Sequence, residues 1–109
     1  MFTDAIRAAE DEHEIYSLVT EYVEGVRFSN PLSILPPSVI ELPLNGAADV
    51  KLRVAMLVIE LDTASRQLDD RACGTIKEAL HIFAAAATRL DLLAMPPGTS
   101  VSEAFREAA

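Results

Sequence analysis

The 109-residue sequence has little material for cross-links or for membrane insertion. Its one cysteine, Cys73, cannot form a disulfide within the chain, and a lone cysteine is typical of a reducing compartment. The longest apolar run, residues 54–59, is far shorter than the roughly 20 residues of a membrane-spanning helix. The first residues lack the basic and then apolar pattern of a signal peptide. These absences predict a cytoplasmic protein with no membrane partner.

Basic residues are also scarce, since 9 lysines and arginines stand against 17 acidic residues and the net charge is −8. A surface of that sign repels phosphate backbones, so we expect no nucleic-acid partner. The sequence contains no glycine-rich phosphate loop, no Gly-x-Ser-x-Gly motif and no Cys-x-x-Cys pair. It therefore predicts no cofactor and no catalytic residue, and it favours a protein that is not an enzyme.

Apolar residues recur at helical spacing in three segments, which predicts an all-α fold. We expect one domain over residues 1–109, a small three-helix bundle. The helices are expected at about 4–27, 47–68 and 76–94. The acidic half of the first segment has few side chains to bury, so we expect it to be loose or to need a partner. In the second segment the apolar stripe extends to Leu68, and in the third a capping box from Thr75 to Glu78 predicts the start of the helix.

Prolines punctuate residues 28–46, which excludes a continuous helix there. The same segment has too many apolar side chains for a solvated loop, so we expect an extended strap across the bundle. A short pair of strands on either side of Pro36 and Pro37 is the alternative. Beyond Pro96 and Pro97, a second capping-box match predicts a short C-terminal helix over residues 101–107.

Both histidines of the chain occur in the pattern Glu-x-x-His, as Glu10 with His13 and Glu78 with His81. This spacing aims a carboxylate and an imidazole at one metal ion in helical di-iron bundles. Glu60 is a further candidate ligand. Helical periodicity, however, puts His13 and His81 roughly opposite the apolar stripes of their helices, whereas such ligands point inward. We therefore expect solvated histidines and no metal, unless these faces meet in an oligomer.

The second and third helices have more apolar surface than three helices of this size can cover. The second helix is apolar on most of its sides, and the third has a face of small residues that another backbone can approach. The residues expected to bind a partner are Leu52, Met56, Ile59, Ala84 and Ala85.

Three functions are consistent with these patterns. The leading interpretation is a non-enzymatic helical interaction or regulatory protein that forms a homodimer or binds another protein. One alternative is a small metal-binding or metal-dependent helical enzyme built on the two Glu-x-x-His pairs. The other is a sensor of hydrophobic small molecules, closed by apolar residues of the strap. Those strap residues are Leu32, Ile34, Leu35, Val39 and Ile40.

Overall fold

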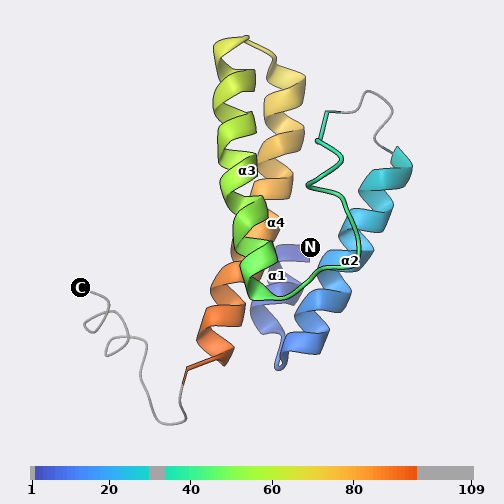
Figure 1. Ribbon diagram of the computed structural model, residues 1–109, viewed down its shortest axis with the longest axis vertical. Helices are drawn as coiled ribbons and strands as arrows, with labels where there is room; N and C mark the ends of the chain where they lie inside the picture. The colour runs from blue at the N-terminus through green and yellow to red at the C-terminus, as the bar shows by residue number, and fades with distance from the viewer. Residues whose placement is uncertain (1, 30–33, 96–109) are drawn as a thin grey trace, which may run out of the picture.

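The computed structural model describes residues 2–29 and 34–95, and this part of the chain contains helices and no strand. The helices are α1 (Phe2–Ala8), α2 (Glu12–Ser29), α3 (Ala47–Arg66) and α4 (Asp70–Leu93). The expected all-α bundle is therefore confirmed. Helix α4 is its centre, because α3, α1 and α2 all pack against it (Figure 1). The predicted helix over residues 101–107 lies outside the described residues.

The single helix expected over residues 4–27 is two helices, because the chain turns sharply between Ala8 and Glu12. Asp11 caps the start of α2, since its Oδ1 accepts a hydrogen bond of 2.8 Å from the backbone N–H of Glu14. The Glu14 carboxylate accepts in return from the N–H of Glu10, at 3.1 Å. The arrangement resembles a capping box, with the N3 carboxylate accepting from the residue before the N-cap, and helical periodicity alone does not reveal it.

The turn lets α1 fold back along the bundle, so the first segment packs against the rest of the chain. Ile6 and Ala9 are completely buried, and the rings of Phe2 and Tyr22 meet edge to face at 5.6 Å. The expectation of a loose first half is therefore wrong. The partner that this segment needs is the chain's own α4.

Helix α4 begins earlier than the capping box at Thr75 predicts. Asp69 is the N-cap, and its carboxylate accepts a hydrogen bond of 3.1 Å from the N–H of Ala72. The helix then runs through Gly74 and Thr75. The connection from α3 is correspondingly short, and Leu68 lies in it with φ of 54° and 87% of its surface exposed. Leu68 is thus a turn residue and not the end of the apolar stripe.

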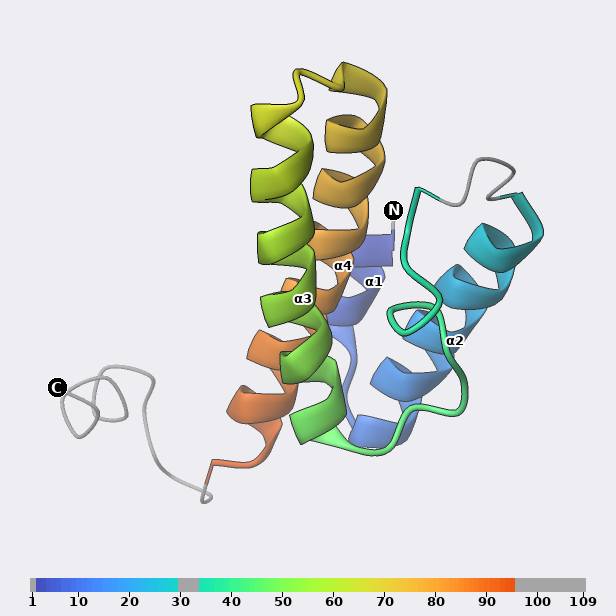
Figure 2. The ribbon, with the colours of Figure 1, turned by 45° about the horizontal axis from the view of Figure 1, so that its top comes forward.

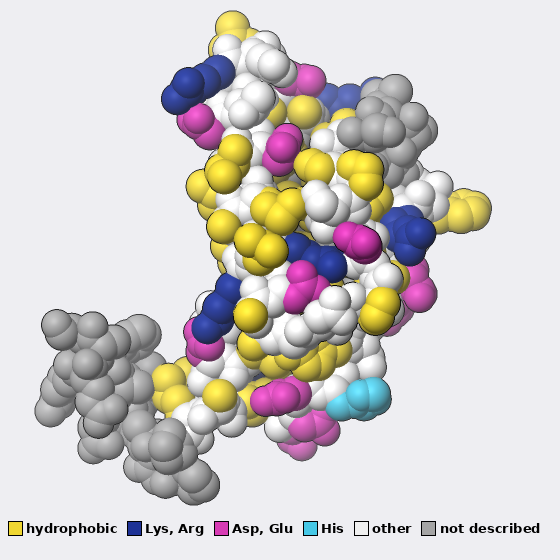
Figure 3. All heavy atoms as spheres, viewed as in Figure 1, with side chains coloured by type: hydrophobic (Ala, Val, Ile, Leu, Met, Phe, Trp, Pro, Cys, Tyr) yellow, Lys and Arg dark blue, Asp and Glu magenta, His cyan; other side chains and the backbone are white. Residues whose placement is uncertain are grey.

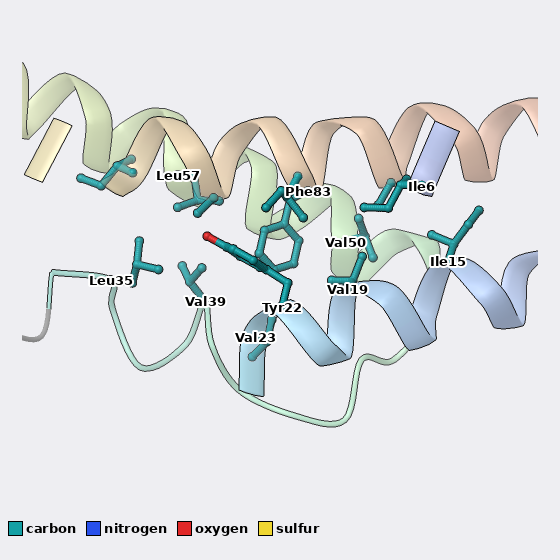
Figure 4. Packing of buried hydrophobic residues seen from close by; sticks show 14 of the residues in the cluster. Ile6, Ile15, Val19, Tyr22, Val23, Leu35, Val39, Val50, Leu57 and Phe83 are labelled. Atoms are coloured by element: carbon teal, nitrogen blue, oxygen red, sulfur yellow. The ribbon is translucent and has the colours of Figure 1, made fainter. Parts of the chain in front are cut away.

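The strap crosses between α2 and α3 without regular structure over residues 34–46 (Figures 1 and 2). The alternative of a strand pair finds no support in these residues. Leu35 and Val39 are buried in the core, and Ile34 and Ile40 pack against it. Figure 4 shows Leu35 and Val39 on the side of the core that faces Leu57. The strap therefore completes the core, which explains its excess of apolar residues. Leu32 lies outside the described residues.

Tyr22 is the one buried tyrosine of this core, 6% exposed, and it packs beside Phe83 (Figure 4). Burial raises the pKa of its phenol well above the usual value near 10, and the carboxylate of Glu78 raises it further. The neutral phenol is therefore the form that the folded state stabilises.

This shift predicts a loss of stability in alkali. Because the pKa of Tyr22 is raised in the folded state, its contribution is complete below pH 10, and it falls as pH rises above 10. We expect Tyr22→Phe to recover on the order of 1 kcal/mol of the unfolding free energy lost between pH 8 and pH 11. Urea unfolding at the two pH values measures this difference. An equal loss in both proteins would contradict the assignment.

Candidate functional site

The outer face of α3 carries the largest group of exposed apolar side chains on a helix of the described chain. Leu52 is 58% exposed and Ile59 is 65% exposed, while Met56 between them is half-buried. All three were expected to bind a partner, and helical spacing places them on one side of α3. Figure 3 shows hydrophobic side chains gathered over α3 on this face of the molecule. Val58, on the same helix, is 52% exposed.

Four exposed apolar residues of this face follow the spacing of a coiled coil. Ala48, Leu52, Ala55 and Ile59 are all exposed and are separated by four, three and four residues. This is the alternation that places successive side chains along one seam of a helix. We call these four residues the α3 seam. Large and small side chains alternate along it, so it is a ridge with gaps rather than a smooth surface.

A groove of about 420 Å³ runs beside the α3 seam, between α3 and the strap. Leu52 and Met56 form its α3 side, and Leu42 and Pro43 form its strap side. Its polar residues include Glu41 and Asn45. The apolar surface of α3 therefore continues into a shallow depression, and a helix lying on the seam would meet both.

Ala84 and Ala85 do not belong to the same surface. They lie on α4 and line a hollow of about 450 Å³ together with Thr3 and Arg7 of α1. The physical reason is the turn before α2, which returns α1 to the small-residue face of α4. The five residues expected to bind one partner are therefore divided between two sides of the bundle, and only those on α3 form an open apolar face.

The candidate metal ligands are dispersed over the bundle. Among the described residues, no group of three or more His, Cys, Asp and Glu side chains is close enough to hold a metal ion. His13 lines a depression beside the strap, whereas His81 lines the hollow beside α1. Glu10 and Glu78 are exposed, and Glu60 is half-buried on α3. One copy of the chain thus does not bring the two Glu-x-x-His pairs together.

Arg53 is the one buried charged residue in the described chain, and sequence reasoning missed it. Only 3% of its surface is exposed, and it donates a hydrogen bond of 2.9 Å to the backbone carbonyl of Val39. It also pairs with Asp49, one turn earlier on α3, at 3.3 Å. Its guanidinium lies 5.9 Å from the ring centre of Phe83. Arg53 therefore ties the strap to α3 and supports the helix that carries the seam.

A signal for Arg53 was present in the sequence. It stands three residues after Val50 and four before Leu57, the spacing of the buried stripe of α3, and Asp49 precedes it by four residues. An arginine within an apolar stripe and one turn from an acid is a candidate for a buried pair. The long apolar stem of arginine allows the rest of the side chain to pack as a hydrophobic one would.

The fold and its surface define the class of this protein as a small all-α bundle with an open apolar helix face. No family model matches the chain, and the comparisons with curated proteins and with solved structures found no match. Over residues 2–29 and 34–95, no helix combines the length and the apolar character needed to cross a lipid bilayer.

Proposed function

We propose that the chain is a non-enzymatic interaction protein that forms a homodimer through the α3 seam. The observation that carries the proposal is the exposure of Leu52 and Ile59 at coiled-coil spacing on a helix whose opposite face is well packed. Exposed apolar surface of this kind favours association, because burial removes it from water. A second copy is the partner whose surface fits the alternation of side chains along the seam.

The α3 seam is complementary to itself when two copies meet antiparallel. In a register with its centre between Leu52 and Ala55, Leu52 lies opposite Ala55 of the second copy. Ile59 then lies opposite Ala48 of the second copy. Each large side chain meets a small one, as interdigitating layers require. A two-fold axis makes both halves identical, so the contact closes at two copies.

This arrangement predicts a weak dimer. Helix α3 has 20 residues, and contact along one such helix stays at the low end of specific interfaces, below about 1,200 Å² in total. The groove beside the seam adds surface around Met56 and Leu42. We therefore expect a dissociation constant of about 1 to 100 µM, with exchange between monomer and dimer. Such an equilibrium suits a regulatory contact better than a permanent assembly.

Sedimentation equilibrium tests the proposal directly. Between about 1 and 300 µM, the apparent mass should rise from the 11.8 kDa of one chain toward twice that value. The double variant Leu52→Lys with Ile59→Lys should remain monomeric over the same range, because it places charges in the seam. Both positions are exposed, so the variant should keep its helical circular dichroism.

Leu68→Lys is the matched control, since Leu68 is 87% exposed but lies in the α3–α4 turn outside the seam. It should dimerise like the unchanged protein. A monomeric unchanged protein at the highest concentration, or equal dimerisation of the double variant, would overturn the α3 seam as the interface.

Two sequence features support expectations about where this dimer occurs and what else it binds. The single cysteine, Cys73, fits a reducing compartment, and we place the protein in the cytoplasm for that reason. The net charge of −8 disfavours nucleic acid as a partner. If the dimer binds further partners, this charge favours proteins with basic surfaces.

A further inference from the structure

The hollow between α1 and α4 gathers cationic and hydrogen-bond-donating side chains in a chain that is otherwise acidic. Arg7 enters it from α1 and Arg89 from α4, and the imidazole of His81 lines it as well. The hydroxyls of Thr3 and Thr88 complete its polar lining. Among the described residues, no aspartate or glutamate lines the hollow. Against a net charge of −8, this is a local concentration of positive charge.

Arg89 is held in place at this hollow. Its Nε–H donates a hydrogen bond of 2.8 Å to the backbone carbonyl of Ala9, at the end of α1. Arg89 is half-buried and lines the hollow, and this hydrogen bond engages only the Nε–H of its guanidinium. The guanidinium is therefore fixed at one end and presents its remaining donors at the hollow. Such preorganisation reduces the entropy that a ligand must offset.

The floor of the hollow is apolar. Ala84 and Ala85 leave room above α4 because their side chains are small, and Leu92 adds further apolar lining. The volume of about 450 Å³ lies within the range of roughly 300 to 1,000 Å³ that is usual for small-molecule sites. The hollow thus combines charged donors on its walls with space for an apolar group beneath them.

We infer that this hollow binds a small phosphate monoester with a short aromatic or apolar body. Two guanidiniums that line one hollow with no acid in its lining repel each other, and a dianionic group bound in the hollow reduces that repulsion. A guanidinium offers paired N–H groups that match phosphate oxygens. Arg7, Arg89, His81 and the two threonines together offer more donors than one carboxylate has sites to accept, which favours phosphate. The site is separate from the α3 seam, and so it does not depend on dimerisation.

Binding is tested with ¹⁵N-labelled full-length protein and three probes: phenyl phosphate, inorganic phosphate and phenol. Phenyl phosphate should shift the amide resonances of residues 81–92 and saturate. Inorganic phosphate should shift the same resonances with at least about tenfold weaker affinity, because it leaves the apolar floor empty. Phenol should cause no saturable shift, since it lacks the charge.

Three variants distinguish binding of phenyl phosphate at this hollow from non-specific attraction of anions to positive charge. Arg7→Gln should weaken phenyl phosphate at least about tenfold, because Arg7 is exposed and its loss removes a charge-assisted contact without unfolding α1. Ala85→Leu should also weaken it by filling the floor. Arg71→Gln is the matched control, because Arg71 is an exposed arginine of α4 outside the hollow. It should change the affinity less than twofold.

Three results would overturn the inference. One is the absence of saturation by phenyl phosphate at about 10 mM in low salt. Another is equal weakening by Arg7→Gln and Arg71→Gln, which would show attraction by charge alone. The third is equal affinity for inorganic phosphate and phenyl phosphate, which would show that the apolar floor takes no part.

Discussion

Replacing Arg53 with alanine is expected to lower the free energy of unfolding by about 3 kcal/mol, since removing one partner of a buried ion pair costs on the order of 3 to 5 kcal/mol. Arg53 is 3% exposed, whereas its partner Asp49 keeps 20% of its side-chain surface in contact with solvent. The partial exposure of Asp49 places the expected loss at the lower end of this range. The alanine also leaves the carbonyl of Val39 without its donor at the strap.

The chain provides its own control for this variant. Arg66 pairs with Asp62 on the same helix and at the same four-residue spacing, but both side chains are more than half exposed. Arg66→Ala should therefore change the free energy of unfolding by less than about 0.5 kcal/mol. Urea unfolding of the two variants, followed by circular dichroism, gives the comparison. Equal losses would contradict the view that Arg53 ties the strap to α3.

Phe83→Ala is expected to cost about 4 kcal/mol, because truncating a buried phenylalanine removes 3 to 5 kcal/mol through lost transfer energy and a residual cavity. Phe83 is completely buried on α4, beside Tyr22 of α2 and near Leu57 of α3 (Figure 4). Its ring also faces the guanidinium of Arg53. The truncation therefore loosens contacts among three helices at once.

Phe28→Ala is the matched control for Phe83→Ala. Phe28 lies near the end of α2 and is 97% exposed, so its truncation removes no core contact. We expect a change within about 0.5 kcal/mol. Thermal unfolding of both variants at pH 7 makes the comparison. A loss above 2 kcal/mol for Phe28→Ala, or below 1 kcal/mol for Phe83→Ala, would contradict the packing described for α4.

Helices α3 and α4 could be predicted because the periodicity of their apolar residues is a local property of the sequence. Residues 47–68 and 76–94 were expected as helices, and α3 and α4 cover most of both ranges. The predicted and observed helices differ at their ends, because a single capping side chain determines where a helix begins. Asp69 caps α4 earlier than the capping box at Thr75 suggested, and Asp11 divides the first helix in two. Capping residues are common in sequences, and only the surrounding chain selects which of them begins a helix.

The candidate surface could be predicted only in part. The apolar excess of α3 was evident from Leu52, Met56 and Ile59, and in the described part of the chain Leu52 and Ile59 are exposed while Met56 is half-buried. The small face of α4 was evident too, but Ala84 and Ala85 line the hollow against α1. No local pattern shows that residues 2–8 return to α4, because this contact joins segments far apart in the sequence.

Composition and periodicity by themselves determined that this chain is helical, acidic and built without disulfides, since these properties follow from residue types and their spacing. The tertiary structure alone decided which apolar faces are covered, that Arg7 and Arg89 line one hollow, and that Arg53 is buried. Which side chains are buried, and which ones come together at one site, depends on how segments far apart in the sequence pack. A stripe on one helix does not state which other segment of the chain will lie against it.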